Sequence, residues 1–402
     1  MAAGPHHRRL LGVTPTVFAA GIVSLLMDIS TEMLTPVLPL FVTGVLGASA
    51  VTLGLIEGAA EATASWLKVV SGRLSDRGAR KPWAVAGYGL SALSRPLLAL
   101  SASWPQLLGA RLVDRTGKGL RGAPRDAIIA ADTPPAELGR AFGVHRAMDT
   151  LGAAIGPLVA FAALPILGYR GLFWLSAVPA ALAVLVLILC VRERWGEVAA
   201  RRDAARAPFP RDGRVLLFLA GVGVFALGNS SDAFLFLRLA DLGIPATTLP
   251  LAYFGFNAIY AAASVPAGVV ADRLGRGRVA SWGLLLFAAV YAGFGLAEAA
   301  WQALVLFALY GLFMAFTDGV WRAYLGELAP ANARGAVYGA YAAVVGAAAL
   351  PASLIAGRLW DALGHGAPFL YGAGMAALGA GILAVGTRRY GIARSGGDGR
   401  VG

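Results

Sequence analysis

Ionisable side chains recur inside long apolar segments of this sequence, at spacings that place them on common helix faces. Asp28 and Glu32 are four residues apart, as are Glu57 and Glu61, so each pair shares one face of a helix. The segment near 105–127 carries further charges, among them Arg111, Asp114, Arg115 and Lys118. Ionisable groups at membrane depth cost about 2.5–3.5 kcal/mol each on insertion scales, so they usually face a cavity and have a function.

These residue types suit a proton carrier that also binds a solute. Desolvation raises the pKa of a carboxylic acid toward neutrality, whereas a neighbouring arginine lowers it. A solute that competes for the arginine therefore couples its binding to protonation. The pattern predicts one site formed by Asp28, Glu32, Arg111 and Arg115. The alternative is that these charges pair only to hold helices together, and for Glu57 and Glu61 both interpretations stay open.

The composition predicts that membrane helices carry these charges. The 402 residues are 58% hydrophobic and 14% charged, with a mean hydropathy of +0.69, whereas soluble domains are about 45–50% apolar and about 25% charged. Ordinary soluble enzymes and disordered chains are excluded. The single Cys190 excludes a disulfide framework, and four histidines leave no metal cluster to build. The net charge of +12 does not indicate a nucleic-acid partner, because the basic residues flank apolar segments.

Long apolar segments divide the chain into membrane spans, each of which needs about 20 mostly apolar residues. The sequence predicts an all-α membrane protein with twelve transmembrane helices. They lie near 14–42, 50–71, 82–102, 105–127, 141–166, 170–191, 214–238, 248–271, 279–298, 301–322, 336–358 and 366–387.

Basic residues concentrate on one side of these spans, including both termini and the hydrophilic stretch 192–213. The positive-inside rule makes that side cytoplasmic, and the composition is consistent with a bacterial inner membrane. A fixed offset of 196 residues relates Gly72, Asp76 and Arg77 to Gly268, Asp272 and Arg273. The same offset relates Pro134 to Pro330. The repeat predicts two pseudo-symmetric six-helix bundles, residues 1–191 and 214–402, joined by a cytoplasmic linker.

The twelve spans, the central hydrophilic stretch and the repeated G-x-x-x-D-R element resemble the major facilitator superfamily. The first copy of the element continues into Arg80 and Lys81. The resemblance implies gate elements in these two loops, made of Gly72, Asp76, Arg77, Arg80, Lys81, Gly268, Asp272 and Arg273. The alternative is that their basic residues only determine topology. The resemblance also implies that the first and fourth spans line a central cavity.

A second motif bears on the direction of transport. Gly152, Gly156 and Pro157 resemble the G-x-x-x-G-P element of proton antiporters in this superfamily, although the Gly-Gly that usually follows is absent. The alternative is close helix packing, which small residues permit. A gate or latch near the cytoplasmic face is the favoured interpretation of Arg121, Arg125, Asp126, Arg146 and Asp149. His145 is expected to be a packing residue.

The second half of the chain carries fewer deep charges. Asn229 and Asp232 are predicted to contact solute, and Asp318 with Arg322, four residues on, is predicted to form a local ion pair. Tyr253, Phe254, Phe256 and Tyr260 either line the cavity or pack between helices.

The predicted function is secondary active transport, as proton-coupled efflux (antiport) of a small organic solute or drug by alternating access. The alternative is proton-coupled symport, the uptake of an anionic metabolite, which the arginines of 105–127 favour. A membrane enzyme or sensor is the third class, but the sequence has no nucleophile–base constellation and no G-x-x-x-x-G-K-[ST] loop. The expected partners are a small-molecule substrate, protons and the lipid bilayer. We expect a monomer without cofactor, metal or nucleic acid.

Overall fold

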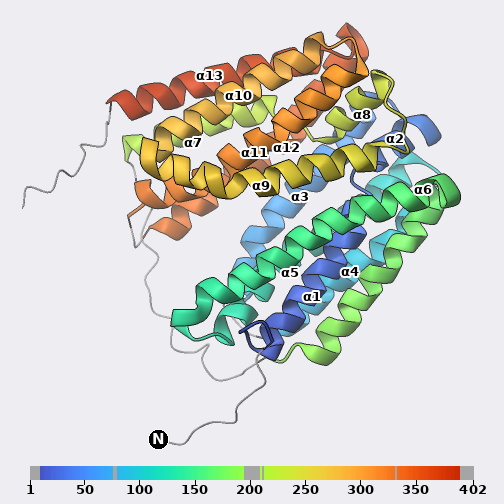
Figure 1. Ribbon diagram of the computed structural model, residues 1–402, viewed down its shortest axis with the longest axis vertical. Helices are drawn as coiled ribbons and strands as arrows, with labels where there is room; N and C mark the ends of the chain where they lie inside the picture. Colours follow the sequence, from blue (N-terminus) through green and yellow to red (C-terminus); the bar gives the residue numbers. More distant parts are fainter. Residues whose placement is uncertain (1–9, 76–78, 194–208, 211, 331–332, 390–402) are drawn as a thin grey trace, which may run out of the picture.

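The computed structural model describes residues 10–75, 79–193, 209–210, 212–330 and 333–389 (Figure 1). These residues are helical apart from short connections and one isolated bridge between Leu10 and Val13. The helices of the first half are α1 (Pro15–Glu32), α2 (Leu38–Leu40), the π-helical η1 (Phe41–Val45), α3 (Ala50–Ser75), α4 (Arg80–Leu100), α5 (Trp104–Ala131), the 3₁₀ turn η2 (Pro135–Glu137) and α6 (Leu138–Cys190). Those of the second half are α7 (Gly213–Gly228), α8 (Ala233–Asp241), α9 (Leu249–Leu274), α10 (Arg276–Leu296), α11 (Ala300–Leu328), α12 (Arg334–Leu363) and α13 (Ala367–Arg389).

These helices supply the twelve predicted spans, so the all-α, two-bundle prediction is confirmed. The first span is α1 continued by α2 and η1, and the seventh is α7 continued by α8. The 53 residues of α6 are two spans, because Gly168 leaves helical geometry at a φ of 64°, which glycine adopts without a steric penalty.

Charge distinguishes some spans from others. Among the described residues, seven helical stretches are long and apolar enough to cross a membrane by length and composition alone. One of them, Pro135–Cys190, contains both spans of α6. The charge-bearing α3 and α5 are not among the seven. Their polar residues are expected to face protein or a cavity instead of lipid.

The two halves of the chain form two groups of helices that converge at one end and spread apart at the other (Figure 1). We call the end where α2 contacts α8 the closed end. The opposite end, where α1 and α7 begin, is the open end. Between the halves, α3 also packs on α12, and α6 packs on α9. The site therefore lies between α1, α3, α5 and α6 on one side and α7 to α9 and α12 on the other.

Candidate functional site

Two adjoining cavities lie between the halves. The central cavity, of about 390 Å³, is lined by charged residues of α1, α3 and α5 and by the α7–α8 connection. The open-end cavity, of about 1270 Å³, reaches from Asp28 to Gly143 and Asp272 at the open end. Glu32, Asp232 and Tyr253 line both cavities. These three residues therefore stand where a solute in the open-end cavity would meet the charged centre.

Arg111 is held by two carboxylates in the wall of the central cavity. Its Nε and Nη2 donate to the two carboxylate oxygens of Glu57, at 2.9 and 2.6 Å. Its Nη1 donates to Asp114 at 3.3 Å. Asp114 also lies 3.3 Å from the guanidinium of Arg95, which donates to Thr31 at 3.0 Å. This four-charge network ties α3, α4 and α5 together and reaches α1.

Two features of this network depart from the predicted site. Asp114 is buried against α4 and does not line either cavity, because a position three residues after Arg111 is rotated from the face shared by 111, 115 and 118. Arg95, only 1% exposed, was missed. Its one signal is an arginine inside an otherwise apolar span, beside Pro96.

Arg115 and Lys118 form the cationic part of the central cavity. Arg115 lies 3.9 Å from the carboxylate of Glu61, whose side chain is 45% exposed. The Nε of Arg115 has no hydrogen-bond partner among the described residues, and within the same ranges Lys118 makes no hydrogen bond or ion pair. Unlike Arg111, whose guanidinium is held by two carboxylates, these two cations retain donors without a partner among the described residues.

Carboxylates from both halves form the side of the central cavity opposite these cations, and each accepts a hydrogen bond from a tyrosine. Tyr253 of α9 donates to Glu32 of α1 at 2.8 Å, and Tyr310 of α11 donates to Asp232 at 2.8 Å. Asn229 and Asp232 flank a break in the seventh span, where α7 ends and α8 begins. The amide oxygen of Asn229 is buried without a partner among the described residues. Interrupted helices of this kind often form transporter binding sites.

Asp28 belongs to the open-end cavity, which it lines together with Asp149. Beside it, Ser24 accepts from Arg125 at 3.0 Å and shares a hydrogen bond with His145 at 2.9 Å. The predicted single site of Asp28, Glu32, Arg111 and Arg115 is therefore divided. Asp28 lies one helical turn nearer the open end than Glu32, about 6 Å along the axis, so only Glu32 reaches the cavity of the arginines.

Gly152 and Gly156 of α6 pack against α1 at the two carboxylate positions. A Cβ on Gly152 would lie 2.6 Å from the carbonyl oxygen of Leu25 and 2.9 Å from the Cβ of Asp28. A Cβ on Gly156 would lie 2.8 Å from the carbonyl oxygen of Ile29 and 2.9 Å from the Cβ of Glu32. Pro157, which follows, is buried. The glycines of this motif therefore fix the distance between α6 and the acidic face of α1.

We expect Gly152→Ala to destabilise the protein by about 1–3 kcal/mol, because the new methyl group meets backbone that cannot move aside. Gly139→Ala is the control on the same helix, since a Cβ there has nothing within 4 Å. Thermal unfolding of both variants in detergent checks this. Equal melting temperatures for the two variants would contradict close packing at Gly152.

The first loop element is described only in part. Asp76 and Arg77 lie outside the described residues, and Gly72 lies near the end of α3. The backbone N–H groups of Arg80 and Lys81 donate to the carboxylate of Glu193, at 2.7 and 3.1 Å. The Lys81 amine donates to the carbonyl of Ile188 at 2.8 Å. These contacts fasten the start of α4 to the end of α6.

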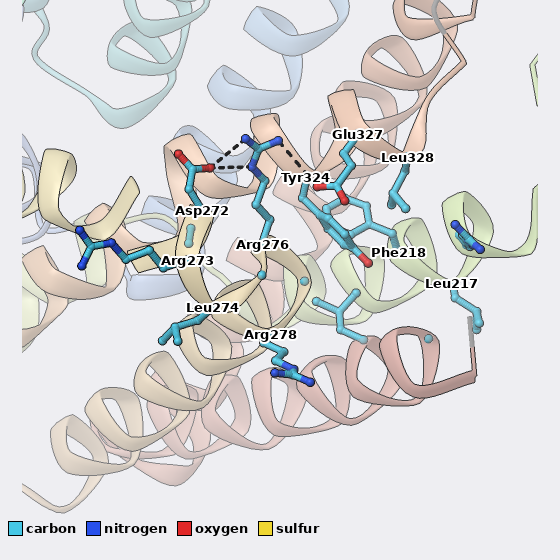
Figure 2. Close-up of a pocket in the computed structure, with 16 residues that line it drawn as sticks. Leu217, Phe218, Asp272, Arg273, Leu274, Arg276, Arg278, Tyr324, Glu327 and Leu328 are labelled. Carbon is cyan, nitrogen blue, oxygen red and sulfur yellow. Dashed lines mark hydrogen bonds and ion pairs between the residues drawn. The ribbon is translucent and has the colours of Figure 1, made fainter. Parts of the chain in front are cut away.

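The second loop element takes part in three linked charges, which come from three helices. Asp272 of α9 accepts from Arg276 of α10 at 2.8 Å, and Arg276 lies 3.7 Å from Glu327 of α11 (Figure 2). Arg273 is exposed. Gly268 and Asp272 line the open-end cavity, as do Asp318 and Arg322.

The predicted local ion pair between Asp318 and Arg322 is confirmed, at 2.7 Å. Tyr260 donates to the same Asp318 carboxylate at 3.0 Å. Asp318 is therefore a cavity carboxylate that has both a tyrosine donor and a cation, whereas Glu32 and Asp232 have the tyrosine donor alone among the described residues.

Comparison with known proteins agrees with this architecture. The family model of the Major Facilitator Superfamily matches residues 20–240 and 215–397. An uncharacterised MFS-type transporter of Methanocaldococcus jannaschii is 34% identical over 377 residues, covering 90% of this chain and 93% of that protein. The multidrug resistance protein MdtH of Aeromonas hydrophila is 26% identical over 305 residues, covering 70% and 77%. A POT family transporter solved in complex with 5-aminolevulinic acid shares the fold, with a TM-score of 0.80, 14% identity, and coverage of 96% and 99%. The chain belongs to the Major Facilitator Superfamily of membrane transporters.

Proposed function

We propose that this transporter exports a small organic solute or drug in exchange for protons, by alternating access. The observation that carries the proposal is the position of Glu32. Its carboxylate lines both cavities and accepts a hydrogen bond from Tyr253 of the other half. Among the described residues, it lies within ion-pair distance of no basic side chain. A cavity carboxylate without a fixed counter-ion is free to take up and release a proton.

Protonation of Glu32 changes the contact between the halves. A hydrogen bond to an ionised carboxylate is roughly twice as strong as one between neutral groups. The deprotonated acid therefore holds α1 to α9 more firmly than the protonated acid does. In the proposed cycle, Glu32 takes up a proton when the site faces the proton-rich side, and solute binding on the other side favours its release. Asp28 and Asp149, nearer the open end, lie on the route between Glu32 and bulk water.

Solute is proposed to bind between the cations and the acids of the central cavity. Arg115 and Lys118 retain unused donors, and Asn229 and Asp232 supply acceptors opposite. The likeness to a multidrug resistance protein supports export of a drug-like solute. A cavity of about 390 Å³ lies within the usual range for small-molecule sites, about 300–1,000 Å³.

Orientation and organisation follow from the same proposal. Arginines gather around the open end, among them Arg140, Arg214 and Arg278, and by the positive-inside rule this end is proposed to be cytoplasmic. Both termini are then cytoplasmic, in a bacterial inner membrane. Residues 1–191 and 214–402 are proposed to move as two units joined by 192–213. A single copy contains the whole site, which supports a monomer.

Uptake of an anionic metabolite by proton symport is the second candidate. Lys118 favours it, because a cavity amine without a hydrogen bond among the described residues suits a carboxylate or phosphate group. The two functions share the same site and differ only in the direction of coupling.

Export can be tested in cells once a solute is found. A metabolite and drug library is screened first for compounds that raise the melting temperature of the purified protein. Cells that express the protein should then accumulate less of the stabilising compound than cells without it, and a protonophore should abolish the difference. Entry of the compound into de-energised cells that alkalinises the medium would instead establish symport, and unaltered accumulation would contradict both functions.

A further inference from the structure

The two halves meet most closely where α3 crosses α12. Glycines line this crossing on both helices. A Cβ on Gly54 of α3 would lie 2.2 Å from the carbonyl oxygen of Ser353, and a Cβ on Gly357 of α12 would lie 2.5 Å from the carbonyl oxygen of Ala50. Backbone therefore packs directly on backbone at this crossing, which continues to the closed end.

At that end, Asp361 of α12 caps α3 across the boundary between the halves. Its carboxylate accepts the backbone N–H groups of Ala50 and Val51, at 3.3 and 3.1 Å. The next N–H, that of Thr52, donates to Ser49 at 3.2 Å. The first N–H groups of a helix have no partner within it, and the positive end of the helix dipole favours a carboxylate. Asp361, in the opposite half, thus supplies both the hydrogen-bond acceptors and the negative charge that stabilise the N-terminus of α3.

Few other polar contacts join the halves. Among the described residues, four hydrogen bonds of standard distance and angle link residues before 193 to residues after 212, and no ion pair does. Two of these bonds belong to Asp361. The others run from Tyr253 to Glu32 and from Asn257 to the carbonyl of Ala153, and both lie along the cavities instead of the closed end. Arg146 and Tyr260 also interact across the boundary, in the wall of the open-end cavity. The position 196 residues before Asp361 is Pro165, so the first half does not repeat the cap.

We propose that Asp361 is a positioning residue of the transport cycle, which holds the closed end shut by capping α3 across the two halves. When the transporter opens at this end, α3 and α12 must separate and both hydrogen bonds must break. The strength of the cap therefore sets the balance between the two states. This inference rests on alternating access and does not depend on proton coupling at Glu32, so either can fail without the other.

The test compares two caps of the same chemistry. Asp361→Ala removes the cap between the halves. Asp212→Ala removes a carboxylate that accepts the N–H of Arg214 at 2.8 Å at the start of α7, a cap that does not bridge the two halves. Asp361→Asn keeps a side-chain oxygen at position 361 that can accept from α3, so this variant should retain much of the cap. All variants are made in the full chain with Cys190, which is exposed, replaced by serine.

Distances between pairs of spin labels, measured by double electron–electron resonance, then report the populations of the two states. One labelled pair, Ala102→Cys with Leu363→Cys, spans the closed end, and another, Gly139→Cys with Leu274→Cys, spans the open end. All four positions are exposed. Asp361→Ala should shift the ratio of the two states by about threefold or more toward a wider closed end and a narrower open end. Asp212→Ala should leave the ratio at the wild-type value. Unaltered distances in Asp361→Ala, or an equal shift in Asp212→Ala, would overturn the proposal.

Discussion

Arg111→Met is expected to destabilise the protein by about 3–5 kcal/mol, the usual cost of removing one partner from a buried ion pair. The substitution leaves the carboxylates of Glu57 and Asp114 without the guanidinium that now donates to both. The side chains of all three residues are at most 10% exposed, so water cannot easily replace it. Thermal unfolding in detergent, followed by intrinsic fluorescence, measures the effect.

Arg322→Met is the matched control, because Arg322 also forms an ion pair on a membrane helix but its side chain is 63% exposed. Removing such a pair costs about 0–1 kcal/mol. A double variant, Arg111→Met with Glu57→Met, should recover part of the loss, since well-packed apolar side chains often replace a buried pair without cost. A melting temperature of Arg111→Met equal to that of Arg322→Met would contradict the structural role given to the Arg111 network.

Glu32→Gln is expected to reduce pH-driven transport at least about tenfold while leaving exchange of labelled for unlabelled solute intact. Glutamine keeps an oxygen that can accept from Tyr253 but does not titrate, so the contact between the halves survives and the proton site does not. Proteoliposomes loaded with a solute identified by thermal stabilisation allow both activities to be measured in one preparation.

Asp318→Asn controls for the loss of any cavity carboxylate that accepts from a tyrosine. Tyr260 donates to Asp318 as Tyr253 donates to Glu32, but Asp318 is also paired with Arg322. Asp318→Asn should therefore retain pH-driven transport. If Glu32→Gln kept that activity in full, Glu32 would not be the coupling residue.

The sequence was sufficient to predict the twelve spans, because a run of about 20 apolar residues is required of any membrane helix. It did not predict the break at Asn229–Asp232 inside the seventh span. There, three small polar residues and Asp232 follow Gly228 without a proline to mark an end. Local hydropathy averages over so short a break, whereas the structure needs it to turn Asp232 toward Tyr310.

The charged positions were predictable, but their partners were not. The four-residue spacing correctly places Arg111 and Arg115 on the same wall of one cavity. Which acid meets which arginine depends on how helices far apart in the sequence are rotated and how deep they lie. Arg111 therefore pairs with Glu57 of α3, whereas Asp28 lies a turn away in another cavity. A single sequence without tertiary contacts contains no signal for that choice.

The proton flux that accompanies solute movement tests the central claim most directly. Inverted membrane vesicles are acidified inside by respiration, and a pH-sensitive dye follows the gradient after the stabilising solute is added. Antiport through Glu32 predicts that the solute collapses the gradient in vesicles with the wild-type protein and leaves it unchanged in vesicles with Glu32→Gln. Solute uptake into wild-type vesicles at full rate, with no loss of the gradient, would contradict proton exchange.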